Sequence, residues 1–174
     1  GQLYYHCLLE QPNFHHYLIY QYYHYHQHKY TFRINNINLK MEKIKVVLAD
    51  DHVVVRSGIK NLLENEGEIT VVGEASNGKE AIVAVEKLNP DMLIIDIRMP
   101  EMNGLEATRE LNKNPDAIKI LILSMHDDED YILQAIECGA SGYLLKDTSK
   151  EEFLKAIKTI NQGGKYFSGD ISQV

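Results

Sequence analysis

The sequence lacks the features that mark several classes of protein. Its two cysteines, Cys7 and Cys138, lie far apart, so they form no disulfide framework, and we expect a reducing, cytoplasmic environment. No apolar run reaches the roughly 18 residues that a membrane-spanning helix requires. No charged segment followed by an apolar stretch opens the chain, as it would in a secretory signal. We therefore expect no membrane partner.

The sequence also lacks an excess of positive charge. Its 18 lysines and arginines are outnumbered by 25 aspartates and glutamates, and the formal net charge is -7. Binding to a phosphate backbone needs a basic surface, so this charge argues against direct binding of nucleic acid. The 174 residues, of which 44% are hydrophobic, are enough for one soluble domain with a sizeable core.

The composition changes sharply at Met41. Residues 1–40 hold six of the eight histidines and eight of the eleven tyrosines, with no helical or strand period. We interpret them as a His/Tyr-rich tail that is non-native or disordered, with Met41 as the natural start. The alternating His24, His26 and His28 leave a metal-binding tract open, although no cysteine or acidic ligand accompanies them.

From Met41 onward, short apolar segments alternate with amphipathic segments of helical period. Apolar strands that alternate with helices are typical of a parallel sheet whose two faces are both covered. The pattern therefore predicts an α/β fold with a doubly wound, five-stranded parallel sheet. Asn77 with Glu80 and Ser149 with Glu152 predict the starts of two of its helices. The five predicted strands span residues 45–50, 69–75, 91–96, 118–124 and 142–146.

Polar side chains follow four of these strands at the point where each strand ends. In such sheets the ligand site lies beyond the carboxyl ends of the strands, so we expect these side chains to converge. Two carboxylates about 4 Å apart repel each other by roughly 4 kcal/mol at an effective dielectric constant near 20, so the cluster needs a cation. The side chains concerned are Asp50 and Asp51 after the first strand, Asp96, Ser124 and Lys146.

The chemistry of this set fits a phosphorylated aspartate. Mg²⁺ prefers oxygen ligands and is often held by one or two carboxylates together with a phosphate. An aspartate can act as a nucleophile and form an aspartyl phosphate, and phosphoryl transfer needs mainly positioning and neutralisation of charge. Lys146 would supply a positive charge and Ser124 a hydroxyl donor. Taken alone, Asp50 or Asp51 would instead be interpreted as a helix N-cap.

Four segments carry a family resemblance: "VLADDH" (47–52), "LIIDIRMPEMNG" (93–104), "LILSMH" (121–126) and "GYLLKD" (142–147). Together they resemble the receiver domain of bacterial two-component response regulators, over residues 41–164. The chain looks most like the nitrate/nitrogen-fixation subfamily, which has a LuxR-type, helix-turn-helix output domain. The resemblance implies a flavodoxin-like strand order of 2-1-3-4-5, with helices on both faces of the sheet.

The resemblance also implies a role for individual residues. The domain would be a phosphorylation-activated switch that assists its own phosphorylation and dephosphorylation but is not an enzyme. The implied roles are these: Asp96 is the phosphoacceptor; Asp50, Asp51, Asp96 and the backbone carbonyl of Arg98 hold Mg²⁺; Lys146 and Ser124 bind the phosphoryl group; Ser124 and Tyr143 form the switch; and Pro100 and Gly104 shape the loop beside the acceptor.

The implied partner is a sensor histidine kinase, which would donate the phosphoryl group. The implied output is homodimerisation, or release of an attached DNA-binding domain that this sequence does not contain. Residues 165–174 would then begin the linker to that missing domain, and DNA would be bound only through it. A long Arg98 and a Met125 at a position that is often small in this family predict an altered rate of autodephosphorylation.

Two other functions remain open at this stage. A haloacid-dehalogenase-like phosphatase also uses an aspartate, a serine or threonine, a lysine and Mg²⁺. Its nucleophile lies after the first strand in a D-x-D motif, whereas Asp50 and Asp51 are adjacent and Asp96 follows the third strand. The other alternative is a stand-alone receiver that acts as an interaction module without being phosphorylated.

Overall fold

The structure is a computed structural model that describes residues 42–114, 117–125 and 128–167. The chain divides into two units, residues 1–41 and 42–174, and the described residues all belong to the second. The predicted tail and its histidines lie outside the described residues, so the interpretation of that segment stays a prediction. None of the described helices is both long and apolar enough to span a lipid bilayer.

The strands of the described part form one parallel sheet in the order β2-β1-β3-β4-β5-β6. Its first five strands have the predicted order 2-1-3-4-5, so the predicted fold class is confirmed. The strands are β1 (Ile44–Ala49), β2 (Ile69–Ala75), β3 (Met92–Asp96), β4 (Lys119–Ser124), β5 (Gly142–Leu145) and β6 (Tyr166–Phe167). The helices are α3 (Val53–Glu64), α4 (Gly78–Leu88), α5 (Gly104–Leu111), α6 (Glu129–Glu137) and α7 (Lys150–Asn161).

The sixth strand is a correction to the five-stranded prediction. Tyr166 and Phe167, which the sequence assigns to a linker, pair in parallel with Gly142 and Tyr143 of β5. Gly142 makes this approach possible, because a Cβ atom at that position would collide with the carbonyl oxygen of Tyr166. A two-residue strand has no period to recognise, so the sequence pattern could not indicate it.

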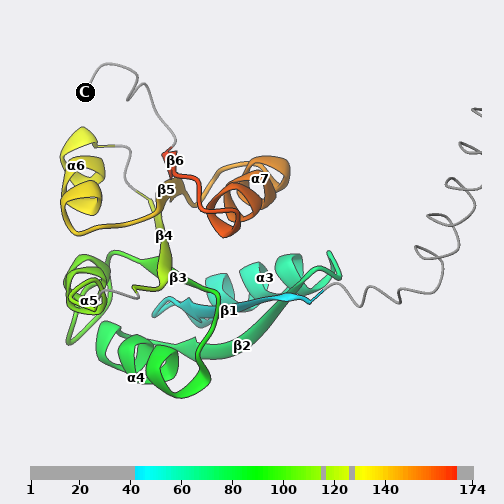
Figure 1. The fold of residues 1–174 in the computed structure, drawn as a ribbon, viewed down its shortest axis with the longest axis horizontal. Helices are drawn as coiled ribbons and strands as arrows, with labels where there is room; N and C mark the ends of the chain where they lie inside the picture. Colours follow the sequence, from blue (N-terminus) through cyan, green and yellow to red (C-terminus); the bar gives the residue numbers. More distant parts are fainter. Residues whose placement is uncertain (1–41, 115–116, 126–127, 168–174) are drawn as a thin grey trace, which may run out of the picture. The chain divides into compact units, whose positions relative to one another are not determined.

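Helices cover both faces of the sheet, as predicted. Figure 1 shows α3 and α7 on one face and α4, α5 and α6 on the other. Alternate residues of the central strands supply the two cores: Val47, Leu93 and Ile95 face α4, α5 and α6, whereas Leu48 and Ile94 face α3 and α7. Every residue of β3 is buried, which explains why its sequence is a continuous apolar run up to its last residue.

The two predicted helix starts are confirmed, but only half of each capping box forms. The side chain of Asn77 accepts a hydrogen bond from the backbone N–H of Glu80, and Ser149 does the same for Glu152. The Glu80 carboxylate instead accepts a hydrogen bond from the backbone N–H of Ser76, at 2.8 Å. The complete capping box lies at the start of α5, where Asn103 and Glu106 cap each other.

Candidate functional site

The side chains predicted to converge lie at one edge of the sheet. Asp96 ends β3 and Ser124 ends β4, and these residues are 6% and 1% exposed. Asp50 directly follows β1 and Lys146 directly follows β5. The backbone N–H of Lys146 donates to the carbonyl oxygen of Ser124 at 2.8 Å. The parallel strands therefore bring these residues to a common mouth.

Lys146 is the cation that the buried carboxylates share. Its Nζ atom lies 2.6 Å from Oδ2 of Asp50 and 2.8 Å from Oδ2 of Asp96. The Lys146 side chain is only 7% exposed, and that of Asp50 only 2%. Burial opposes the charged form of the lysine, but hydrogen bonds and charges from Asp50 and Asp96 outweigh it and raise the pKa of Lys146. The ammonium group is therefore held charged in a desolvated site.

At Asp96 the effect of burial on the pKa outweighs the effect of the neighbouring ammonium group. Burial raises the pKa of the Asp96 carboxyl above its ordinary value of 3.8, although Lys146 partly opposes this effect. The charge on Asp50 adds to the rise. A single lysine therefore does not fully compensate the two buried carboxylates, and this end of the sheet favours a further positive charge.

The third carboxylate, Asp51, stands at the solvent side of the cluster with 32% of its side chain exposed. Its Oδ1 atom is nevertheless buried and has no hydrogen-bond partner among the described residues. Asp50, Asp51, His52 and Asp96 each offer one ligand atom, and these atoms all lie within 4.8 Å of one another. A buried carboxylate oxygen without a donor, within an acidic cluster of this size, fits a divalent cation.

Backbone contacts around Asp50 explain how the sequence builds the cluster. The N-cap of α3 is His52, whose side chain makes no capping hydrogen bond. Instead Oδ1 of Asp50 accepts from the backbone N–H of His52 at 2.8 Å, and the backbone N–H of Asp50 donates to Ala75 at 3.1 Å. Asp50 is thus fixed from both sides, and neither it nor Asp51 is the helix N-cap.

The loop from β3 to α5 approaches the main chain of Asp96 closely. A Cβ atom at position 104 would collide with the carbonyl oxygen of Asp96, so only glycine fits there. The loop also holds Glu101 at a φ of 64°, in the left-handed region that residues other than glycine rarely adopt. Pro100 lies exposed in the same turn. This arrangement fits the loop-shaping roles predicted for Pro100 and Gly104, which stay predictions.

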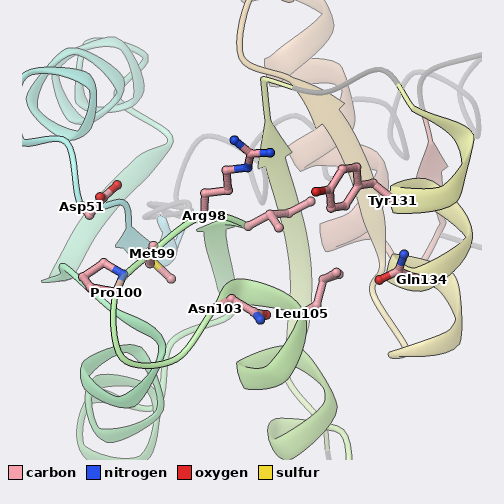
Figure 2. A pocket seen from close by; sticks show the side chains of 9 residues that line it. Asp51, Arg98, Met99, Pro100, Asn103, Leu105, Tyr131 and Gln134 are labelled. Atoms are coloured by element: carbon pink, nitrogen blue, oxygen red, sulfur yellow. The ribbon is translucent and has the colours of Figure 1, made fainter.

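Two cavities adjoin the acidic cluster. The larger, about 550 Å³, lies between the loop after β3 and α6. In Figure 2, Asp51 stands on one side of it and Tyr131 and Gln134 on the other. The smaller cavity, about 400 Å³, opens onto Asp96 itself. Its lining is His52, Val55, Asp96, Arg98, Met125 and Lys146.

Comparison with known proteins identifies the family to which the fold belongs. A family model for the response regulator receiver domain matches residues 46–158. The chain belongs to this family. The predicted resemblance is therefore confirmed, and the acidic cluster occupies the mouth of a receiver domain. Membership of this family favours a signalling role over the phosphatase alternative.

The relatives also confirm the predicted subfamily. The transcriptional regulatory protein DegU of Brevibacillus brevis is 44% identical over 131 residues, which are 75% of this chain and 56% of DegU. The nitrate/nitrite response regulator NarL of Escherichia coli strain K12 is 39% identical, over 76% of this chain and 62% of NarL. This receiver chain thus spans less than two thirds of the length of these relatives.

Solved receiver structures have the same architecture. A LuxR-family response regulator from Aurantimonas sp. SI85-9A1 matches with a TM-score of 0.71 and 36% identity, over 76% of this chain and 94% of that one. The receiver domain of a putative NarL from Mycobacterium tuberculosis matches with a TM-score of 0.68 and 35% identity. That match covers 70% of this chain and 98% of the other.

Three further residues, Tyr143, His52 and Arg56, lie in or beside the elements that form the site. Tyr143, the predicted switch residue, is fully buried in β5 and pairs with Ile122 of β4. The sequence interpretation set His52 aside as a metal ligand, because a site rich in oxygen prefers a hard ion, and it did not include Arg56 in the site. Arg56 donates to the backbone carbonyl of Asp50 and to Glu74. The available signal was the position of Arg56 in the first turn of α3, five residues after Asp51.

Proposed function

We propose that this receiver domain is a phosphorylation-activated switch in which Asp96 accepts a phosphoryl group from a sensor histidine kinase. The observation that carries the proposal is the environment of Asp96. It is a nearly buried carboxylate at the end of β3, 2.8 Å from a buried ammonium group, and a cavity of about 400 Å³ reaches it from solvent. These are the requirements of a nucleophile that a partner must reach.

The transfer breaks one bond and forms another. An ionised oxygen of Asp96 attacks phosphorus, the P–N bond of the donor phosphohistidine breaks, and the donor nitrogen retains the electron pair. Lys146 already contacts Asp96, so its ammonium group is in place to bind the phosphoryl oxygens as negative charge gathers on them. Because Lys146 also contacts Asp50, it remains positioned when Asp96 is modified.

A magnesium ion is the cofactor that the donor set fits. Asp50, Asp51 and Asp96, with the backbone carbonyl of Arg98, would hold it, since Mg²⁺ takes oxygen ligands and few of them need come from protein. When bound, it would neutralise charge on the phosphoryl group. The orphaned Oδ1 of Asp51 supports this assignment most directly.

The proposed switch connects Asp96 to β5. Ser124 would turn toward the phosphoryl group, and Tyr143, which lies on the neighbouring strand, would respond to the space that Ser124 leaves. Phosphorylation then biases two packed states of the surface formed by α6, β5 and α7. The output in the cytoplasm would be dimerisation, or release of a DNA-binding domain attached beyond residues 165–174.

Incubation with Mg²⁺ and a small phosphodonor, followed by intact mass measurement, tests the proposal. We expect the wild-type chain to gain the mass of one phosphoryl group and the Asp96→Asn variant to gain none. Omission of the metal should suppress the labelling. Labelling of Asp96→Asn at the same level would refute the assignment. Continuous turnover of the phosphodonor without a labelled protein would instead indicate a phosphatase.

A further inference from the structure

His52 stands beside the acidic cluster in a position that capping of α3 does not explain. Its side chain makes no capping hydrogen bond and is 67% exposed. Its Nδ1 atom nevertheless lies 2.8 Å from Oδ1 of Asp51 and 3.4 Å from Oδ1 of Asp50. One edge of the imidazole ring therefore faces the carboxylates while the rest of the ring stays in solvent.

The contact between His52 and Asp51 is not a hydrogen bond. Nδ1 of His52 is 2.8 Å from Oδ1 of Asp51, yet this oxygen has no hydrogen-bond partner among the described residues. The distance is therefore short enough for a hydrogen bond, but the angle at Nδ1 is unsuitable. Two neighbouring ligands of one octahedral ion have this relationship. With metal–ligand distances of about 2.1 Å and right angles between them, such ligands stand about 3 Å apart. The distances of 2.8 and 3.4 Å in the structure lie on either side of that value.

Resting on the function proposed above, we propose that Nδ1 of His52 is a ligand of the metal ion that Asp50, Asp51 and Asp96 hold. The imidazole takes the place of one of the waters that a bound Mg²⁺ ordinarily keeps. Mn²⁺ and Mg²⁺ both take mainly oxygen ligands, but Mn²⁺, a first-row transition metal, accepts an imidazole nitrogen more readily than Mg²⁺ does. The site therefore binds Mn²⁺, and divalent ions like it, more tightly relative to Mg²⁺ than a site made of oxygen ligands alone.

A competing explanation makes the opposite prediction for metal binding. If His52 only forms an ion pair with Asp51, the imidazolium ion occupies the place of the metal and hinders its entry. Loss of the imidazole would then strengthen the binding of both Mg²⁺ and Mn²⁺. If His52 is a ligand, its loss weakens Mn²⁺ binding and leaves Mg²⁺ binding nearly unchanged. The direction of the change in a His52 variant therefore separates the two explanations.

The test uses the full chain and its His52→Gln variant, which keeps a polar side chain but replaces the nitrogen ligand by an amide. Titration with Mn²⁺, followed by the electron paramagnetic resonance signal of the free ion, gives its affinity, and competition gives that of Mg²⁺. We expect the variant to lose about tenfold in Mn²⁺ affinity. Pulsed resonance should show nitrogen coupling to Mn²⁺ in the wild type and lose it in the variant. The tail histidines are the same in both proteins, so they act as an internal control.

The outcomes that would overturn the inference are distinguishable. Equal Mn²⁺ affinity and the same nitrogen coupling in His52→Gln would overturn the inference, and so would tighter binding of both metals. Asp51→Asn should weaken the binding of both metals, and circular dichroism confirms that each variant is folded.

If Mg²⁺ supports labelling of Asp96 while His52→Gln has no effect on metal binding, only this inference fails. If Asp96 is labelled with neither metal, the proposed function fails as well.

Discussion

Nζ of Lys146 lies 2.8 Å from Oδ2 of Asp96, and each of these two side chains is 7% exposed. Removal of one partner from a buried ion pair leaves an uncompensated charge, which typically destabilises a protein by about 3–5 kcal/mol. We expect Lys146→Met to lower the free energy of unfolding by about 3 kcal/mol, measured by urea denaturation in the presence of a chelator.

The matched control is Lys79→Met. Lys79 pairs with Glu101 at 3.4 Å, and both side chains are more than half exposed. An exposed pair contributes little, so this variant should change stability by less than about 1 kcal/mol. Equal losses of stability in the two variants would contradict the argument that burial strengthens the dependence on Lys146.

Asp96 should reduce stability at neutral pH because the fold raises its pKa. The folded protein binds the Asp96 proton more tightly than the unfolded chain does, so stability falls as the pH rises through the raised pKa. Asp96→Asn leaves Lys146 paired with Asp50, so it creates no uncompensated charge and should increase the free energy of unfolding at neutral pH, in the presence of a chelator. The gain should shrink as the pH falls through the raised pKa and should be lost below the ordinary value of 3.8. The exposed Glu86→Gln serves as the control, and a gain that does not vary with pH would contradict the argument.

Arg98 and Met125 should set the lifetime of the phosphoryl group. Both line the cavity over Asp96, and Met125 is 72% exposed there. We expect Arg98→Ala and Met125→Ala each to admit water and to speed hydrolysis by up to about tenfold, which corresponds to about 1.4 kcal/mol in the barrier. Decay of the labelled species by intact mass measures the lifetime, with the exposed Lys87→Ala as control. Unchanged lifetimes in both variants would refute the prediction.

The glycine that packs against Asp96 offers a test of the loop. Gly104→Ala would place a methyl group against the carbonyl of Asp96, and overpacking of this kind costs about 1–3 kcal/mol. It should also slow phosphorylation, since it displaces the acceptor. Gly58 lies within α3, where an added Cβ would meet nothing within 4 Å beyond its own stretch of helix, so Gly58→Ala should stabilise the protein by about 0.5–1 kcal/mol. Thermal unfolding should therefore show a lower midpoint for Gly104→Ala and a higher midpoint for Gly58→Ala than for the wild type.

The sequence could predict the parts of the site that follow from strand order. Asp96, Ser124 and Lys146 end or follow apolar runs, and parallel strands bring such ends together whatever the loops do. The sequence could not predict the orientation of side chains in the loops. His52 is adjacent to the aspartate pair, but only the turn before α3 decides that its Nδ1 atom faces Asp51. The capping box at Asn103 and Glu106 was also missed, although its spacing is the one that predicted the helix start at Asn77 and Glu80.

The short strand β6 has a mechanical consequence for whatever chain follows Phe167. Phe167 pairs directly with Tyr143, so the outgoing chain is tied by its backbone to the residue proposed to report on Asp96. Tyr166 adds a second tie, because its hydroxyl donates to Glu152, which also accepts from Thr148 in the loop after Lys146. A force on the chain after Phe167 is therefore transmitted to β5 through these two contacts. A displacement of β5 is transmitted to that chain through the same contacts.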